Sequence, residues 1–285
     1  MKEPMKYAMC NELYEAWSFE RVCDFLAEHG YGGVEIAPFT FATDTPSDVR
    51  TITGERRKRL RQVAEKSGVQ ITGLHWLLAK TEGFHLTSPD HEVRKKTAEY
   101  FAALIQLCAD FNGSYMVLGS PKQRSLLPGV TKEQAMDYAC DVLGQLVPLL
   151  EKTNVVLAME PLTTAETDFI TTSAEGVALM KKIDAPQQVA LHLDCKAMSS
   201  ESTPIPDLIH KYGEEMVTFH ANDPNLQGPG FGELDFVPIL AALRDMDFDG
   251  WVSVETFDFS PGPERLTIES IEYMKRCDAL SEPGV

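Results

Sequence analysis

The chain has 285 residues and a formal charge of −17, from 43 acidic and 26 basic residues. Nucleic acids and anionic membrane surfaces bind clustered Lys and Arg, so this acidic balance disfavours both as partners. An apolar share of 44% is normal for a globular protein and excludes disorder as the dominant state. The length also fits a single α/β barrel, which usually takes roughly 250 residues.

The sequence carries no sign of a membrane span or of disulfide bonds. No apolar run approaches the roughly 18 residues that a spanning helix needs, and the first residues lack the apolar core of a secretory signal. The six cysteines form no Cys-x-x-Cys pair. We therefore expect a cytoplasmic protein whose cysteines are reduced thiols.

Eight short apolar segments, several rich in Val, Ile or Met, are predicted as buried parallel strands. They are Tyr7–Cys10, Gly33–Ile36, Gln70–Leu74, Tyr115–Leu118, Val155–Met159, Val189–Leu193, Val217–Phe219 and Val252–Val254.

Segments with helical periodicity lie between these strands and after the last one. They are Ser18–His29, Gly54–Lys66, Asp90–Phe111, Thr131–Lys152, Ser173–Ile183, Pro204–Tyr212, Phe236–Arg244 and Pro263–Leu280. The fourth of them opens with a capping-box-like Thr-Lys-Glu-Gln, and its Pro148 is expected to kink the last turns.

Eight strand–helix units without a linker predict an α/β fold, a single (β/α)8 TIM barrel over residues 1–285. A doubly wound sheet is the alternative. It usually shows a Gly-rich phosphate-binding turn after the first strand, and none follows Cys10.

The last four predicted strands each end in an ionisable residue: Glu160, Asp194, His220 and Glu255. In a TIM barrel this end of the strands carries the active site. Three converging carboxylates repel one another unless a cation joins them. Three carboxylates with one imidazole suit Mn²⁺, Mg²⁺ or Co²⁺ better than structural Zn²⁺. Any one of the four alone is explained as a salt-bridged strand end, but four in succession predict one divalent metal ion, with Mn²⁺ as the first candidate.

The sequence resembles the xylose-isomerase-like TIM-barrel family of sugar isomerases and epimerases, especially its D-tagatose/D-psicose 3-epimerase and hydroxypyruvate isomerase branches. The resemblance covers almost the whole chain and rests on separations of 34, 26 and 35 residues between the four strand-end residues, and on the Glu160-Pro-Leu segment. It implies that these four hold the metal, that Glu160 and Glu255 are also the acid/base pair, and that Glu166 contacts substrate.

Two positions depart from the ketohexose 3-epimerases in that family. Ala197 stands where they carry a His, and Leu226 stands where they carry an Arg. Both of those family residues handle the substrate near the reacting carbons. The departures therefore imply a different substrate on the same metal platform.

The expected function is that of a metal-dependent isomerase or epimerase acting on a small sugar, keto-sugar or sugar derivative through a cis-enediolate. The metal acidifies a C–H next to a carbonyl, one glutamate removes the proton and the other returns one. A lyase of the inosose-dehydratase or keto-glycoside-eliminating type is the alternative. An AP-endonuclease-like enzyme needs a basic groove, which the acidic chain disfavours. A non-catalytic sugar-binding barrel is disfavoured by the acid/base pair, and a homo-oligomer stays open.

Eight residues are candidate substrate contacts: Glu166, His75, His192, Lys196, Asn222, Asp223, Lys122 and Arg124. Each also has an alternative. His192 is equally well a buried barrel histidine, and Lys196 equally well pairs with Glu166 or Asp223. Lys122 and Arg124 could hold a phosphate or carboxylate, although solvated loop charges are the simpler interpretation.

The other candidates are expected at the pocket wall or behind it. Asn222 and Asp223 are favoured to orient His220. Of the pair that ends the third strand, His75 is expected to face the pocket and Trp76 to pack in the core. Glu35 is expected either to bind sugar hydroxyls or to anchor a loop.

Overall fold

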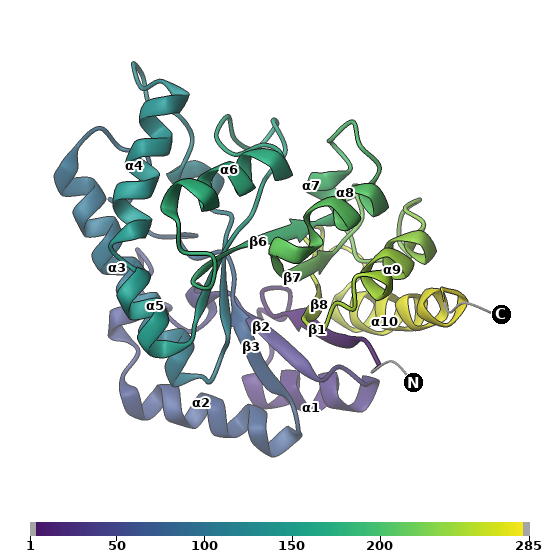
Figure 1. Ribbon diagram of the computed structural model, residues 1–285. Coiled ribbons are helices and arrows are strands. Elements are labelled where there is room, and N and C mark those ends of the chain that lie inside the picture. Colours follow the sequence, from purple (N-terminus) through teal and green to yellow (C-terminus); the bar gives the residue numbers. More distant parts are fainter. Residues whose placement is uncertain (1–3, 282–285) are drawn as a thin grey trace.

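Short runs of buried residues form eight parallel strands that close into a barrel surrounded by helices (Figure 1), as seen in a computed structural model that describes residues 4–281. The strands are β1 Lys6–Cys10, β2 Gly33–Ile36, β3 Gln70–Leu74, β4 Tyr115–Leu118, β5 Val156–Met159, β6 Val189–Asp194, β7 Met216–Ala221 and β8 Trp251–Val254. β1 pairs with both β2 and β8, which closes the ring. The predicted (β/α)8 fold is confirmed, while both ends of the predicted domain 1–285 lie outside the described residues.

Helices follow the strands along the chain and cover the barrel (Figure 1). They are α1 Phe19–His29, α2 Gly54–Ser67, α3 His91–Asp110, α4 Lys132–Gly144, α5 Val147–Thr153, α6 Ser173–Ile183, α7 Cys195–Met198, α8 Ile205–Tyr212, α9 Phe236–Asp245 and α10 Pro263–Leu280. Four single 3₁₀ turns accompany them: η1 Pro38–Thr40, η2 Val49–Thr51, η3 Pro121–Gln123 and η4 Gly213–Glu215.

The predicted helix Thr131–Lys152 is in fact two helices. The capping box at its start is confirmed, because Thr131 and Gln134 each accept from the other's backbone N–H. The helix ends at Gly144, and α5 begins anew with Pro148 in its first turn. A proline lacks the N–H that an interior helical position needs, but it fits a first turn. Pro148 therefore starts a helix where the sequence predicted a kink.

Strand register brings the four strand-end residues to one level. Asp194 of β6 is paired with His220 of β7. Glu255 follows Val254, the partner of Ala221, and Glu160 follows Met159, the partner of Leu191. Because parallel strands end at the same edge of the barrel, the carboxyl-terminal mouth is lined by these side chains.

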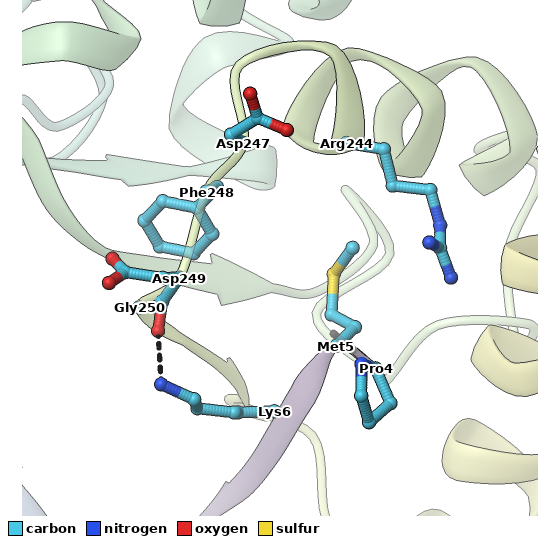
Figure 2. Close-up of a pocket in the computed structure, with 8 residues that line it drawn as sticks. All are labelled: Pro4, Met5, Lys6, Arg244, Asp247, Phe248, Asp249 and Gly250. Atoms are coloured by element: carbon cyan, nitrogen blue, oxygen red, sulfur yellow. Dashed lines mark hydrogen bonds between the residues drawn. The ribbon is translucent and has the colours of Figure 1, made fainter. Parts of the chain in front are cut away.

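The opposite end of the barrel holds a separate cavity of about 270 Å³ (Figure 2). It lies between the start of β1 and the loop that precedes β8, where Lys6 Nζ donates to the Asp249 carbonyl at 2.7 Å. Phe248 and Met5 supply apolar lining. None of the predicted site residues lines this cavity.

The prediction of reduced cysteines agrees with the structure. All six cysteines are free thiols, and five of them are buried. Within residues 4–281, no helix combines the length and the apolar character that a membrane span requires.

Candidate active site

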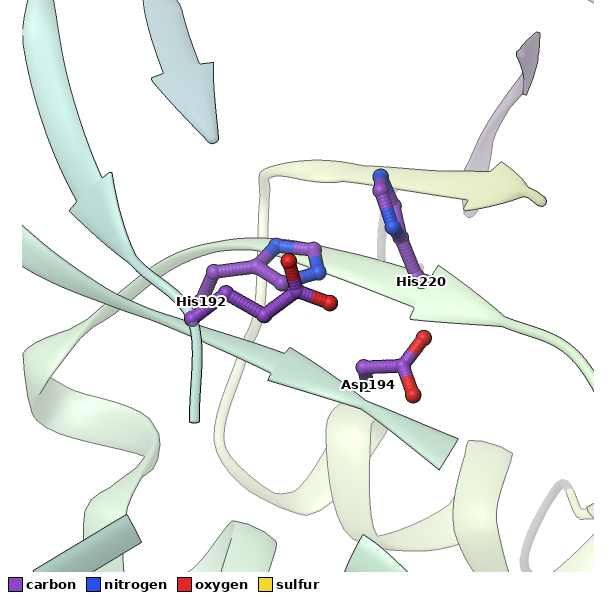
Figure 3. Close-up of side chains that lie close together, drawn as sticks. His192, Asp194 and His220 are labelled. Carbon is purple, nitrogen blue, oxygen red and sulfur yellow. The ribbon is translucent and has the colours of Figure 1, made fainter. Parts of the chain in front are cut away.

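Side chains from β5 to β7 converge at the mouth of the barrel. One donor atom from each of Glu160, His192, Asp194 and His220 lies within 4.8 Å of the others, and all four residues are buried. Figure 3 shows His192, Asp194 and His220 approaching one another from β6 and β7. This group contains three of the four predicted metal ligands and adds His192, so the predicted set with Glu255 stays a proposal.

Glu255 lies beside this group and is tied to it. Its Oε2 is 3.1 Å from His220 Nδ1, and its Oε1 accepts a hydrogen bond from the Trp76 indole at 2.8 Å. The Asn222 amide donates both to Glu255 Oε2, at 3.4 Å, and to Asp194 Oδ2, at 2.5 Å. Asn222 therefore holds two of the carboxylates together, a role close to the predicted one but directed at Asp194 and Glu255.

The carboxylate of Glu160 differs from its neighbours in having no hydrogen-bond donor among the described residues. It lines the active-site pocket, and among the described residues none donates a hydrogen bond to its side chain. Its Oε2 lies so close to Gly119, the residue after β4 that follows Leu118, that a Cβ atom there would overlap it. Glycine at position 119 thus makes room for the Glu160 carboxylate to face the pocket.

The carboxylates of the site disfavour one another's ionisation. Burial raises the pKa of Glu160 well above its usual range, and the charges of Glu255 and Asp194 raise it further. Burial and the Glu255 charge also raise the pKa of Asp194. For Glu255, burial acts in the same direction, but His220 outweighs it and lowers the pKa. A bound cation would relieve this repulsion.

A pocket of about 330 Å³ opens beside Glu160 and Glu255. Lys196 reaches it from α7 and pairs with Glu166 at 2.7 Å, so one of the two expected roles of Lys196 is present in the structure. Its ammonium also lies 4.1 Å from the centre of the Phe257 ring. Glu166 lines the same pocket, as does the exposed Lys122. Their substrate contacts stay predictions.

Trp76 is a pocket residue that the sequence analysis assigned to the core. Its ring lines the pocket and lies 5.9 Å from Phe257 in a stacked arrangement. The backbone of Trp76 has a φ of 50°, a left-handed conformation that is an outlier for a bulky residue. No sequence pattern announces that conformation, which turns the indole toward Glu255 and leaves His75 facing inward.

His75 lies behind the pocket, which corrects its expected position at the wall. Its side chain has no exposed surface, and Nε2 lies 2.7 Å from Glu12 Oε2. The other ring nitrogen lies 3.7 Å from Glu35 Oε1. Glu35 in turn lies 3.0 Å from His220 Nε2. A chain of alternating carboxylates and imidazoles thus supports His220 from below.

Two other candidates do not line the pocket. His192 is the buried barrel histidine that the sequence left open as one alternative, whereas Asp223 differs from its predicted role. His192 is completely buried and neither ring nitrogen has a hydrogen-bond partner, while its ring lies 4.1 Å from that of His220. Asp223 accepts from the backbone N–H of Leu234 at 3.1 Å, so it shapes the loop after β7 and does not contact His220.

Arg124 is a buried clamp on the backbone and not a solvated or substrate-facing cation, which corrects the prediction. Its guanidinium is fully buried and donates to the carbonyls of Glu160, at 2.6 Å, and Ile170, at 3.1 Å. Burial lowers its pKa to about 10, against the opposing effect of Glu160. Arg124 therefore fixes the strand end that carries Glu160.

We expect Arg124→Met to lower the free energy of unfolding by about 3 kcal/mol or more, because the substitution leaves buried carbonyls without donors. Denaturant titration followed by circular dichroism measures the loss. Lys122→Met, an exposed cation two residues away, is the matched control, with an expected change within about 0.5 kcal/mol. Equal effects of the two variants would contradict the clamp.

With this geometry established, comparison with known proteins identifies the family. Residues 23–277 match the model of the family described as Xylose isomerase-like TIM barrel. The chain belongs to this family. The resemblance inferred from the strand-end residues is thereby confirmed.

Curated relatives in the family are sugar epimerases. The D-psicose 3-epimerase of Ruminiclostridium cellulolyticum is 25% identical over 267 residues, which are 90% of this chain and 84% of that protein. The probable ketose 3-epimerase of Synechocystis sp. is 25% identical over 231 residues, 81% of this chain and 75% of that protein. The prediction of an enzyme is confirmed at this level.

Solved structures support the fold independently. The D-psicose 3-epimerase from Clostridium cellulolyticum with D-tagatose superposes with a TM-score of 0.82 at 20% identity, covering 96% of this chain and 99% of that one. The 3-keto-D-glucoside 4-epimerase from E. coli also reaches 0.82, at 18% identity, covering 96% of this chain and 100% of that one.

Proposed function

We propose that this enzyme is a divalent-metal-dependent epimerase or isomerase of a keto-sugar, with Glu160 and Glu255 as its acid/base pair. The observation that carries the proposal is the buried cluster of Glu160, Asp194 and His220 at the barrel mouth, beside a pocket that Glu160 and Glu255 line. Burial and the charge of Glu255 raise the pKa values of both Glu160 and Asp194. Mn²⁺ is the first candidate ion, ahead of Mg²⁺ and Co²⁺. We further propose a cytoplasmic location and leave a homo-oligomer open.

The donor set fits such an ion. Carboxylate oxygens with one imidazole suit a hard or borderline divalent cation. An oxygen of the Glu160 carboxylate, to which no described residue donates a hydrogen bond, lies within 4.8 Å of one of the unpartnered nitrogens of His192. When bound, the ion would polarise a substrate carbonyl and acidify the adjacent C–H.

The two glutamates suit different parts of the proton transfer. No described residue donates a hydrogen bond to the Glu160 side chain, so its carboxylate, ionised once a cation is bound, would be free to take a proton from a substrate in the pocket. Glu255 is held in one orientation by Trp76 and His220. They follow β5 and β8 and both line the pocket, and we propose that they act from different sides of a bound substrate. Transfer by one and return by the other inverts a stereocentre or moves a carbonyl.

The test is the mass and configuration of the product. Incubation with Mn²⁺ and a panel of ketoses, keto-glycosides and inososes is expected to give a product of unchanged mass and altered configuration. Loss of water or of an attached group would instead assign the enzyme to lyase chemistry. Cleavage of an abasic duplex would contradict the sugar assignment altogether.

Glu35 gives a prediction about the support beneath the site. It accepts hydrogen bonds from Tyr115 and Ser253, both at 2.6 Å, while its other oxygen faces His220. In Glu35→Gln one end of the side chain becomes a donor facing other donors. We expect Mn²⁺ affinity to fall by about 10–100-fold, measured by titration of the metal-free protein. Tyr115→Phe removes one donor but keeps the carboxylate, so an equal loss in that variant would contradict a specific role for Glu35.

A further inference from the structure

A second cavity of about 400 Å³ adjoins the mouth of the barrel. It is formed by the segments that follow β1 and β2, together with the start of α2. We call it the aromatic groove, because five aromatic residues line it: Tyr14, Trp17, Phe19, Phe39 and Phe41. Its rim carries hydrogen-bonding and charged groups, among them Thr40, Glu15 and Arg56.

The aromatic groove lies next to the active-site pocket and shares one lining residue with it. Lys80 lines both cavities. Phe39 of the groove lies 5.9 Å from the ring of Trp76 in the pocket, and the Lys80 ammonium lies 4.0 Å from the Phe39 ring centre. Trp76 stacks in turn on Phe257. The rings of Phe39, Trp76 and Phe257 therefore form one aromatic wall that extends from the groove into the pocket. The middle ring, Trp76, donates a hydrogen bond to Glu255.

The segment that joins the two cavities has an unusual backbone. Trp76 has a φ of 50° and Lys80 a φ of 59°, and neither is a glycine. Residues held in this region are uncommon, and their strain is retained where the surroundings impose it, often at ligand sites. Here both conformations direct side chains into the shared wall. This observation is independent of the cavity shapes and points to the same place.

We propose that the substrate is a glycoside of a keto-sugar, with the keto-sugar ring in the active-site pocket and the group attached through its glycosidic oxygen in the aromatic groove. This inference rests on the proposed function and adds the substrate class. An aromatic wall with a polar rim matches such a group, since apolar C–H faces or a phenyl ring pack on aromatic side chains while hydroxyls reach the rim. A free ketose occupies the pocket alone and gains nothing from the groove.

The kinetic test compares free ketoses with glycosides. D-Allulose and D-tagatose are assayed beside methyl and phenyl 3-keto-β-D-glucoside, with Mn²⁺ present. The phenyl glycoside is expected to have a kcat/KM about tenfold or more above that of either free ketose, because it buries an additional ring. Phe39→Ala and Thr43→Trp, the second of which fills the groove from its exposed rim, are expected to raise KM for the phenyl glycoside about tenfold. Thr43→Trp, at a position that does not line the active-site pocket, should leave kcat/KM for the free ketoses unchanged.

Phe248→Ala is the matched control, because Phe248 is a half-buried ring in the cavity at the opposite end of the barrel (Figure 2). This variant should leave kcat/KM unchanged for every substrate. The inference would be overturned if kcat/KM were the same for free ketoses and glycosides and Thr43→Trp changed neither. A dimer that Thr43→Trp dissociates would also overturn it, since a second copy would then occupy the groove.

A binding measurement separates this inference from the proposed function. Phenyl 3-keto-β-D-glucoside is titrated calorimetrically into the wild-type protein and into Thr43→Trp. Binding to the wild type that Thr43→Trp weakens supports the groove even if no turnover occurs, and in that case the proposed function alone has failed. Equal binding by both proteins, or no binding by either, would overturn the proposal that the groove binds part of the substrate.

Discussion

Glu160→Gln and Glu255→Gln are each expected to lower kcat by about 10³-fold or more, because glutamine keeps the shape of the side chain but can neither take nor return a proton. Steady-state assays on the best substrate of the panel measure the loss. The two variants are expected to differ in stability. The pKa of Glu160 is raised by burial and by its neighbours, so its neutral form is the favoured one and Glu160→Gln stabilises the metal-free protein. The pKa of Glu255 is lowered by His220, so Glu255→Gln destabilises it.

The control for both variants is Glu233→Gln, which neutralises an exposed carboxylate in the loop after β7. It should retain full activity. Because the two active-site variants are predicted to shift the unfolding midpoint in opposite directions, a common folding defect cannot account for both losses of activity. Substantial residual turnover in Glu160→Gln and Glu255→Gln alike would contradict the acid/base assignment.

Removal of divalent metal is expected to abolish activity, and restoration of Mn²⁺ to recover it, with about one ion bound per chain. Asp194→Asn should weaken binding strongly, because Asp194 is a carboxylate already oriented by Ala197 N at 2.7 Å and by Asn222. Elemental analysis and titration of the metal-free protein give the stoichiometry and the affinity. Asp207→Asn, an exposed residue in the first turn of α8, is the matched control.

A chain that stays active in excess chelator with no bound metal would reject the metal-dependent scheme. Loss of metal binding in Asp194→Asn but not in Asp207→Asn would locate the ion at the barrel mouth. Equal binding by both variants would place it elsewhere.

The barrel was predictable because its causes are local. Apolar runs such as Tyr115–Leu118 give buried strands, and caps such as Thr131 give helix starts. The break between α4 and α5 was not predictable from the sequence, because a proline inside a helical pattern is compatible with a kink, an end or a new start. In the structure the helix ends before Gln145 and a new one begins after Leu146.

The residues of the site also fall into a group that the sequence predicts and a group that it does not. Residues at strand ends, such as Asp194 and His220, were found because parallel register alone brings them together. Residues that depend on loop conformation were misplaced. Trp76 reaches the pocket through a left-handed backbone, and Arg124 is buried because carbonyls distant in sequence need its donors. Neither feature can be predicted from the spacing of residue types along the sequence.

The proton transfer at the centre of this account is tested most directly by nuclear magnetic resonance of the reaction in D₂O. With Mn²⁺ and a turned-over keto-sugar, solvent deuterium should enter one carbon next to the carbonyl. It should do so in the wild type and in Glu233→Gln, but not in Glu160→Gln or Glu255→Gln. Product that forms with no deuterium at any carbon, or deuterium uptake that persists in both active-site variants, would contradict proton transfer by these two glutamates.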